Sequence, residues 1–202
     1  MPSQKDLNEM KKNIILIGIL NPYENKSYFN NLNNNNITSC CMELIPRISR
    51  AQSMDVLSSQ ANLAGYRAVI DAAAKFGKAF PMMMTAAGRI NPAKVMILGV
   101  GVAGLQAIAT AKRLGAVVSA TDVRSATKEQ VESLGGKFIM VEDDESKEAE
   151  TSDGYAKEMS EEYKKKQAIL IAETVSKQDI IICTALIPGR PAPVLITEEM
   201  VN

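Results

Sequence analysis

Residues 94–104 read KVMILGVGVAG, an apolar run that leads into three glycines with G-x-G-x-x-G spacing. The run predicts a strand, and the glycines predict a tight turn that opens a helix. Gly99 would permit the turn, Gly101 would let backbone N–H groups approach a pyrophosphate, and Gly104 would let helix and strand pack closely. Asp122 ends the next apolar stretch, where a carboxylate can accept hydrogen bonds from an adenosine ribose. This context favours a bound dinucleotide over a glycine turn that holds no ligand.

Strands and helices are expected to alternate around this motif. The expected strands and helices are 94–98, 102–114, 116–121, 126–134, 137–141, 157–175 and 179–183 in chain order. The alternation predicts an α/β fold with a doubly wound parallel sheet of Rossmann type. A full dinucleotide fold has about six strands. We therefore expect a fragment truncated at both ends, with a compact four-strand domain as the alternative.

The N-terminal part resembles the remnant of a second α/β lobe. Residues 14–20 are apolar and rich in β-branched side chains, which predicts a strand buried on both faces. A short helix over 26–32 and a short strand over 39–44 should follow. The Ala-rich stretch 53–80 predicts one long helix that joins the two lobes and is stopped by Pro81.

Composition excludes several classes of chemistry. The 202 residues contain no His, so this chain holds no Ser-His-Asp triad, His-ligated zinc or His base. Lys plus Arg and Asp plus Glu both number 23, and this neutral balance argues against nucleic acid as a partner. The three Cys are expected to be buried reduced thiols, and no metal site is expected. No apolar run approaches the roughly 20 residues of a membrane-spanning helix.

Two polar features refine the nucleotide hypothesis. Asp122 would repel the 2′-phosphate of NADP, whereas Arg124 could receive it; we favour NAD because the acid holds the expected position. The segment 47–60, RISRAQSMDVLSSQ, combines Gln and Ser that can hold a carboxamide with Arg and Asp that can fix a ribose. A capped, solvated helix start explains the same segment, and on general grounds it is the stronger explanation.

Four strings resemble the NAD(H)-binding domain in the alpha subunit of proton-translocating NAD(P) transhydrogenases, within the alanine dehydrogenase/pyridine nucleotide transhydrogenase family. They are RISRAQSMDVLSSQANLAGY at 47–66, PMMMTAAG at 81–88, DGYAKEM at 153–159 and TALIPGRPAP at 184–193. The resemblance extends over about residues 14–201, without most of the family's N-terminal lobe and its last strands. It implies three parts: the lobe remnant at 1–46, a nicotinamide-side loop with the linking helix at 47–80, and an incomplete NAD-binding domain at 81–202.

The resemblance also implies roles for individual residues. Arg47, Gln52 and Asp55 match a catalytic loop beside the nicotinamide and its ribose. The other residues that match contacts to NAD(H) are Ser58, Val102, Asp122, Val123, Arg124, Gly154, Tyr155, Gln167 and Leu186. Gly154 ends an acidic segment, 142–154, and Tyr155 follows it. The composition of this segment suits a mobile lid over bound nucleotide, although a solvated loop has the same composition.

The function implied is hydride transfer from NADH on this chain to NADP⁺ on a partner domain or subunit. A membrane-embedded proton-channel partner would couple the transfer to proton translocation and hold the chain at the cytoplasmic face of a bacterial inner membrane. A homodimer is expected. An alanine dehydrogenase is one alternative, but it needs an acid or base that does not stand out here. A nucleotide-binding remnant without turnover is the other.

Overall fold

The computed structural model describes residues 1–141, 159–186 and 191–201. The chain divides into two compact units, Met1–Gln60 and Ala61–Asn202. Each unit contains its own cluster of buried apolar side chains.

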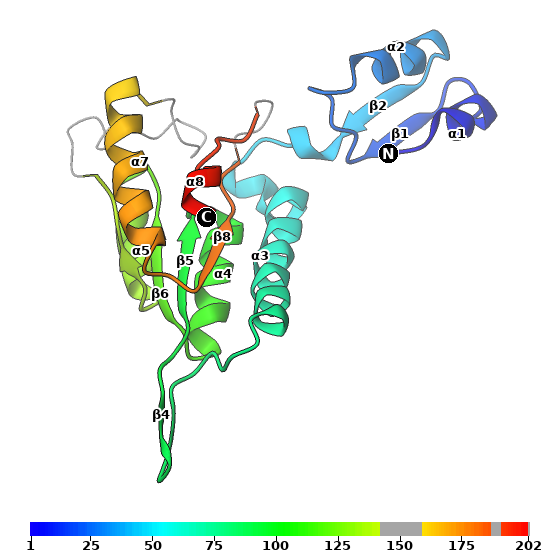
Figure 1. Cartoon of the computed structure of the whole chain (residues 1–202). Coiled ribbons are helices and arrows are strands. Elements are labelled where there is room, and N and C mark those ends of the chain that lie inside the picture. The colour runs from blue at the N-terminus through cyan, green and yellow to red at the C-terminus, as the bar shows by residue number, and fades with distance from the viewer. Residues whose placement is uncertain (142–158, 187–190, 202) are drawn as a thin grey trace. The chain divides into compact units, whose positions relative to one another are not determined.

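The second unit is built around a four-stranded parallel sheet with the order β7-β6-β5-β8 (Figure 1). Its strands are β5 (Lys94–Leu98), β6 (Val117–Thr121), β7 (Lys137–Phe138) and β8 (Ile180–Cys183). Its main helices are α4 (Val102–Arg113), α5 (Thr127–Ser133), α7 (Glu161–Val175) and α3 (Val56–Lys75), of which the residues from Ala61 onward belong to this unit. The parallel α/β fold of Rossmann type predicted from the sequence is confirmed.

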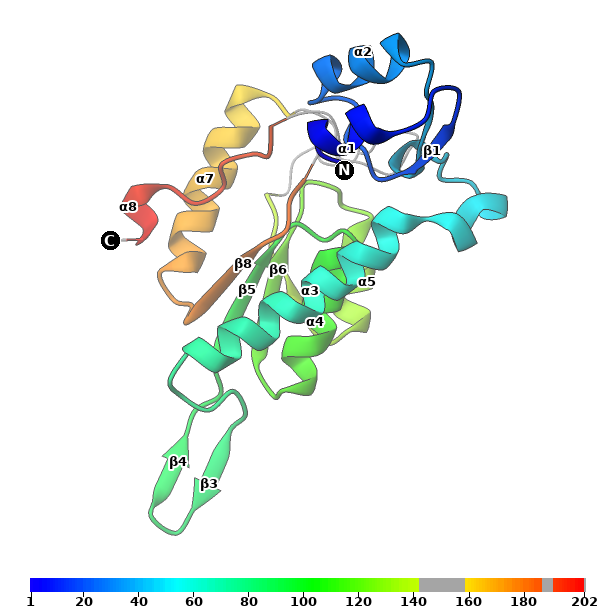
Figure 2. The ribbon, with the colours of Figure 1, turned by 90° about the vertical axis from the view of Figure 1, so that its right-hand side faces the viewer.

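Strand β5 lies in the centre of the sheet because both of its faces are apolar. Val95 and Ile97 pack in one cluster with side chains of α3, α4 and α5. Met96 and Leu98 point to the opposite face and pack with Ile171 of α7. A strand covered on both faces needs the continuous hydrophobic run that the sequence shows here. The two layers of helices follow from this, with α7 on one face and α3, α4 and α5 on the other (Figures 1 and 2).

Three boundaries differ from the prediction. Strand β7 spans two residues instead of five, and its pairing with β6 ends at Phe138 opposite Ala120. Helix α7 begins at Glu161, where the Ser160 hydroxyl accepts a hydrogen bond from the Tyr163 N–H. The expected start at 157 lies outside the described residues. Helix α3 ends at Lys75, before Gly77, whose φ of +70° is typical of the residue after a helix, and not at Pro81.

An antiparallel hairpin of β3 (Met83–Thr85) and β4 (Gly88–Ile90) was not anticipated from the sequence. It projects from the second unit, near the end at which β5 begins (Figures 1 and 2). Every residue of both strands is exposed. A short helix, α8 (Glu198–Val201), lies near the C-terminus and was also missed.

The first unit contains α1 (Gln4–Glu9), α2 (Lys26–Asn34) and a parallel pair of strands, β1 (Ile15–Gly18) and β2 (Thr38–Cys41). Two 3₁₀ turns follow, η1 (Met42–Leu44) and η2 (Ser49–Met54). The expected strand over 39–44 therefore ends at Cys41. The prediction that 14–20 is buried on both faces is wrong: Ile15 and Ile17 are 66% and 65% exposed. The buried cluster of Leu7, Tyr28, Leu32 and Ile37 covers only the other face of this two-stranded sheet.

Candidate functional site

The glycine turn follows β5 at the carboxyl edge of the sheet, and its three glycines meet different surroundings. Gly99 has φ +96°, and a Cβ there would lie 2.7 Å from the Ala185 nitrogen. A Cβ at Gly104 would lie 2.0 Å from the Gly99 carbonyl oxygen. A Cβ at Gly101 would meet no atom of the described residues within 4 Å. The first and third glycines are thus required by the fold, whereas the second leaves open space above the turn.

Helix α4 starts at this open space without a side-chain cap. Gly101 is the N-cap residue, and the first backbone bond runs from the Leu105 N–H to the Gly101 oxygen at 2.9 Å. The N–H groups of Val102, Ala103 and Gly104 therefore precede the helical ladder. Unpaired N–H groups and the positive end of the helix dipole favour an anion such as a phosphate at this point.

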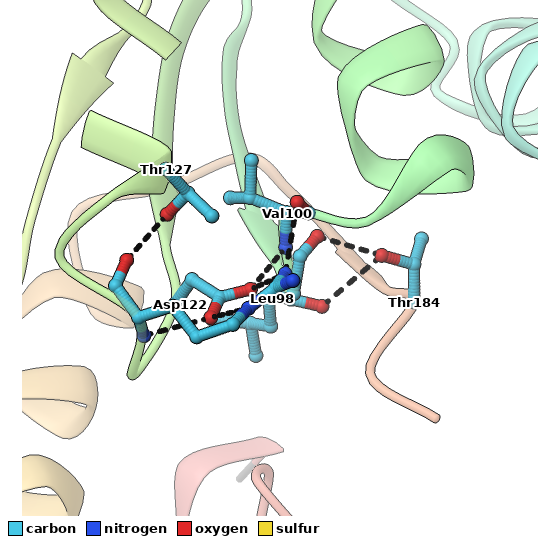
Figure 3. Close-up of polar contacts among 7 residues, drawn as sticks. Leu98, Val100, Asp122, Thr127 and Thr184 are labelled. Atoms are coloured by element: carbon cyan, nitrogen blue, oxygen red, sulfur yellow. Dashed lines mark hydrogen bonds and ion pairs between the residues drawn. The ribbon is translucent and has the colours of Figure 1, made fainter. Parts of the chain in front are cut away.

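Asp122 follows β6 at the same edge of the sheet and is 9% exposed (Figure 3). Its Oδ2 accepts hydrogen bonds from the Val100 N–H at 2.7 Å and from Arg124 Nη2 at 2.9 Å. Its Oδ1 accepts from the N–H and the Nε of Arg124, each at 2.9 Å. Burial alone would raise the pKa of Asp122, but the hydrogen bonds and charge of Arg124, with the Val100 N–H, hold that pKa below its ordinary value.

The Asp122 carboxylate is therefore already saturated. An ionised carboxylate offers about four acceptor positions, and protein donors hold all of them. Arg124 also donates from Nη2 to the Val100 carbonyl at 3.1 Å, which links the acid to the glycine turn. Its charge also offsets the carboxylate that was expected to repel a 2′-phosphate. The Asp-Val-Arg spacing in the sequence was the available signal for this pair.

Two further residues support the turn. The Thr184 hydroxyl donates to the Gly99 carbonyl at 2.7 Å and so ties the end of β8 to the turn (Figure 3). Gly65 lets α3 approach the first turn of α4, since a Cβ there would lie 2.0 Å from the Ala103 oxygen. The position of Thr184 directly after an apolar strand was a usable signal; the partner of Gly65 cannot be read from the sequence.

The polar loop before α3 belongs to the first unit and forms its own small network. Asp55 accepts hydrogen bonds from the Ser58 N–H at 2.9 Å and the Ser58 hydroxyl at 2.6 Å, and lies 3.9 Å from Arg47 Nε. The Ser58 bonds, chiefly, hold the pKa of Asp55 below its ordinary value. These contacts match the helix-cap interpretation of the segment. Gln52 on η2 is exposed, and its amide makes no hydrogen bond to other described residues.

The positions of the remaining predicted site residues say less about their predicted roles. Val123 is half-buried after Asp122, and Gln167 is half-buried on α7. Leu186 is 68% exposed beyond β8. Gly154 and Tyr155, with the expected lid at 142–154, lie outside the described residues. The structure thus brings the glycine turn, Asp122, Val123 and Arg124 to one edge of the sheet, and the roles of Gln167, Leu186, Gly154 and Tyr155 stay predictions.

An adenosine diphosphate fits the chemistry of this edge. The open space at Gly101 and the N–H groups at the start of α4 suit two linked phosphates, and a buried carboxylate lies at the end of the neighbouring strand. Ligands of open parallel sheets bind outside the carboxyl ends of the strands, where connections depart to opposite faces. Here α4 and α7 lie on opposite faces of β5, which places the glycine turn at such a point.

Comparison with known proteins agrees with this geometry. Two family models match, "Alanine dehydrogenase/PNT, C-terminal domain" over residues 68–202 and "Alanine dehydrogenase/PNT, N-terminal domain" over residues 1–64. A chain of NAD(P) transhydrogenase subunit alpha from Rhodospirillum rubrum is 66% identical over 193 residues, which are 96% of this chain and 50% of that protein. Alanine dehydrogenase of Bacillus subtilis is 25% identical over 207 aligned residues, covering 100% of this chain and 47% of that one.

A solved structure gives the same result. The transhydrogenase of Sinorhizobium meliloti superposes with a TM-score of 0.87 at 56% identity, covering 99% of this chain and 53% of that one. The chain therefore spans about half the length of the relatives it matches. Across the described ranges, none of the helices has both the length and the apolar character needed to cross a membrane.

Proposed function

Because the chain belongs to the alanine dehydrogenase/PNT family, we propose that it binds NAD(H) as part of the alpha subunit of an NAD(P) transhydrogenase. The identity of 66% to a transhydrogenase subunit, against 25% to an alanine dehydrogenase, supports this choice within the family. The dinucleotide would lie across the carboxyl edge of the sheet of the second unit, with its adenosine half at β5 and β6.

The observation that carries the proposal is the space above Gly101. Within the described part of the chain, a Cβ at this glycine meets no neighbour within 4 Å, although the other two glycines of the motif are tightly enclosed. Packing therefore does not explain a glycine at this position, but the close approach of a pyrophosphate to the backbone does. The N–H groups of Val102, Ala103 and Gly104 would donate to that pyrophosphate.

At the nicotinamide end, the chain would serve to orient the ring. Bound NADH would supply a hydride that passes directly to NADP⁺ held by a partner. Such an exchange needs no general acid or base at the reacting carbon, only juxtaposition and orientation. Gln52 has an amide available to hold the carboxamide, while Arg47 and Asp55 would fix the adjoining ribose. Ser58 would keep Asp55 in place.

The partners follow from this reaction. A partner domain or subunit would bind NADP(H), and a membrane-embedded proton-channel subunit would couple hydride transfer to proton translocation. This chain would then be peripheral, at the cytoplasmic face of a bacterial inner membrane. Gln167 and Leu186 would add contacts to NAD(H), as would Gly154 and Tyr155.

We also propose that the protein is a homodimer and that the β3–β4 hairpin forms part of its interface. The hairpin and the residue before it expose Met82, Met83, Met84 and Ile90, each at least half exposed. A two-stranded hairpin is marginally stable by itself in water, and a cluster of exposed apolar side chains marks a contact surface. A second copy of the chain would supply both the missing contacts and the symmetry of a closed dimer.

An exchange assay tests the proposed function. The chain is mixed with an NADP(H)-binding transhydrogenase partner and supplied with NADPH and an oxidised NAD analogue whose reduced form absorbs at a distinct wavelength. Reduction of the analogue that depends on this chain is expected. Alanine-dependent formation of NADH would select an alanine dehydrogenase instead. Tight NADH binding with neither activity would select a non-catalytic nucleotide-binding role.

A further inference from the structure

Arg124 holds the Asp122 carboxylate at the adenosine end of the proposed site. What we infer from this contact rests on the proposed function. We propose that the Arg124 side chain is a displaceable cover over Asp122. Its guanidinium holds the carboxylate positions that an adenosine ribose would use, so that dinucleotide binding requires the guanidinium to move away. Arg124 would thereby set the affinity of the site, in addition to any contact it makes with the nucleotide.

The hydrogen bonds define what is covered. The guanidinium reaches both carboxylate oxygens, from Nε to Oδ1 and from Nη2 to Oδ2, each at 2.9 Å. The Val100 and Arg124 N–H groups hold one further position on each oxygen, at 2.7 and 2.9 Å. A ribose with 2′- and 3′-hydroxyls needs two acceptor positions on the acid. Since about four exist on a carboxylate, two of these protein donors must leave.

The side-chain donors are the ones that can leave. The Val100 N–H belongs to the glycine turn, which is enclosed at Gly99 by Ala185 and tied to β8 by Thr184. The backbone of Arg124 is anchored because its carbonyl accepts a hydrogen bond from the Thr127 hydroxyl at 2.7 Å (Figure 3). The guanidinium stands at the end of a long side chain with several rotatable bonds, and it also donates to the Val100 carbonyl at 3.1 Å. It can turn away from Asp122 while both backbone donors stay in place.

The exchange has a cost, which is why it affects affinity. Two hydroxyl hydrogen bonds would replace the two charge-strengthened bonds from the guanidinium to Asp122, and the guanidinium would also lose its bond to the Val100 carbonyl. The Asp122 and Arg124 side chains are 8% and 13% exposed, so solvent screens the pair only weakly. The closed pair therefore opposes binding. Without the guanidinium, the carboxylate would keep its two backbone donors and offer two open positions to the ribose.

The test is a calorimetric titration of the 202-residue chain with ADP-ribose, whose ribose and pyrophosphate both belong to the second unit's site. Arg124→Ala should bind ADP-ribose about 3- to 10-fold more tightly than wild type, as expected when a competing bond of ordinary strength is removed. The matched control Lys128→Ala removes an exposed cation from the neighbouring α5 and should leave the affinity unchanged within about twofold. An Arg124→Ala variant with unchanged or weaker affinity overturns the cover.

A second measurement uses the wild-type chain, so its result does not depend on whether the Arg124→Ala variant folds. The ¹⁵N-labelled Arg124 Nε–H signal, identified by its loss in Arg124→Lys, should be protected from hydrogen exchange in the free chain and lose that protection with saturating ADP-ribose. A signal that stays protected overturns the cover but leaves the proposed function intact. Failure of the wild-type chain to bind ADP-ribose at all overturns the proposed function, and the cover with it.

Discussion

Asp122 shows how a single residue can have a structural and a binding role at once. Its carboxylate joins the glycine turn to the segment before α5 through Val100 and Arg124. Removing one partner of a buried ion pair is costly because the other charge stays desolvated. Substitutions at Asp122 will therefore change stability as well as nucleotide affinity, and the two effects have to be measured separately.

The pH dependence of unfolding should show the structural role. The pKa of Asp122 is lower in the folded chain than in the unfolded one, so the unfolded state binds more protons in acid. The stabilisation is present above the unfolded pKa and is lost as the pH falls below about 4 and through the folded pKa. Asp122→Asn should lower the free energy of unfolding at pH 7 by about 1–3 kcal/mol and flatten its fall between pH 5 and 3.

Denaturant titrations across this pH range check the prediction. Asp71→Asn is the matched control, because Asp71 pairs with Arg67 on the exposed face of α3. That variant should lose at most about 0.5 kcal/mol, as is usual for exposed helical ion pairs. Equal losses and equal pH profiles for the two variants would contradict the structural role of Asp122.

Gln52 is the residue at which orientation can be separated from binding. Its exposed amide is free of hydrogen bonds to the described part of the chain, so its replacement should not disturb the fold. Gln52→Ala should slow hydride transfer by about 10-fold or more while changing the Kd for NADH much less. Single-turnover transfer with the partner and equilibrium titration supply the two numbers. Gln60→Ala, on the exposed side of α3, is the control; equal losses in rate and affinity for Gln52→Ala would reject an orienting role.

At the scale of elements, the hairpin offers the sharpest test. If β3 and β4 lie in a dimer interface, replacing an exposed apolar side chain should weaken the dimer without unfolding either unit. Met84, which is 69% exposed, is the best target. Met84→Ser should raise the dimer dissociation constant by at least about 10-fold, since a buried Met side chain contributes roughly 1.5–3 kcal/mol. Sedimentation across a concentration series measures this constant. Val117→Ser is the control, an exposed apolar residue on β6; a dimer of unchanged affinity in Met84→Ser would remove the hairpin from the interface.

The elements also show what the sequence could predict. The glycine motif and the apolar runs predicted β5, α4, β6 and β8 to within about a residue of their bounds, because local pattern and tertiary burial agree there. The hairpin was missed because Met83, Met84 and Ile90 are apolar yet exposed, so pattern and burial disagree. The strand β1 was assigned two buried faces because of the same disagreement, since Ile15 and Ile17 are also apolar yet exposed. Its isoleucines are fully apolar, and only the structure reveals which face is covered.

Only part of the candidate site could be predicted from the sequence. The glycines, Asp122 and the start of α4 follow from the spacing of the motif in the sequence. The saturation of Asp122 by Arg124 does not, because it depends on side-chain conformations at the edge of the sheet. Thr184 lies 85 residues along the chain from Gly99, and only the pairing of β5 with β8 brings the two together.

At the scale of the whole molecule, each unit carries its own group of predicted site residues. The second unit carries the glycine turn, Asp122 and Arg124, which would bind the adenosine half of the dinucleotide. The first unit carries Arg47, Gln52 and Asp55, whose predicted role is in hydride transfer. Binding of the adenosine half can therefore be tested on this chain alone, whereas a test of hydride transfer would also need an NADP(H)-binding partner.

Gly101→Ala tests the nucleotide site most directly, because its Cβ fills the space assigned to the pyrophosphate and lies within 4 Å of no atom in residues 1–141, 159–186 and 191–201 apart from its own neighbours in the chain. Calorimetric titration with NADH should give clear binding to the wild-type chain and at least about 10-fold weaker binding to Gly101→Ala, equivalent to about 1.4 kcal/mol. The variant should lose no more than about 1 kcal/mol of unfolding free energy, the usual cost of alanine at a helix N-cap. Equal NADH affinity for the two folded chains would contradict the account.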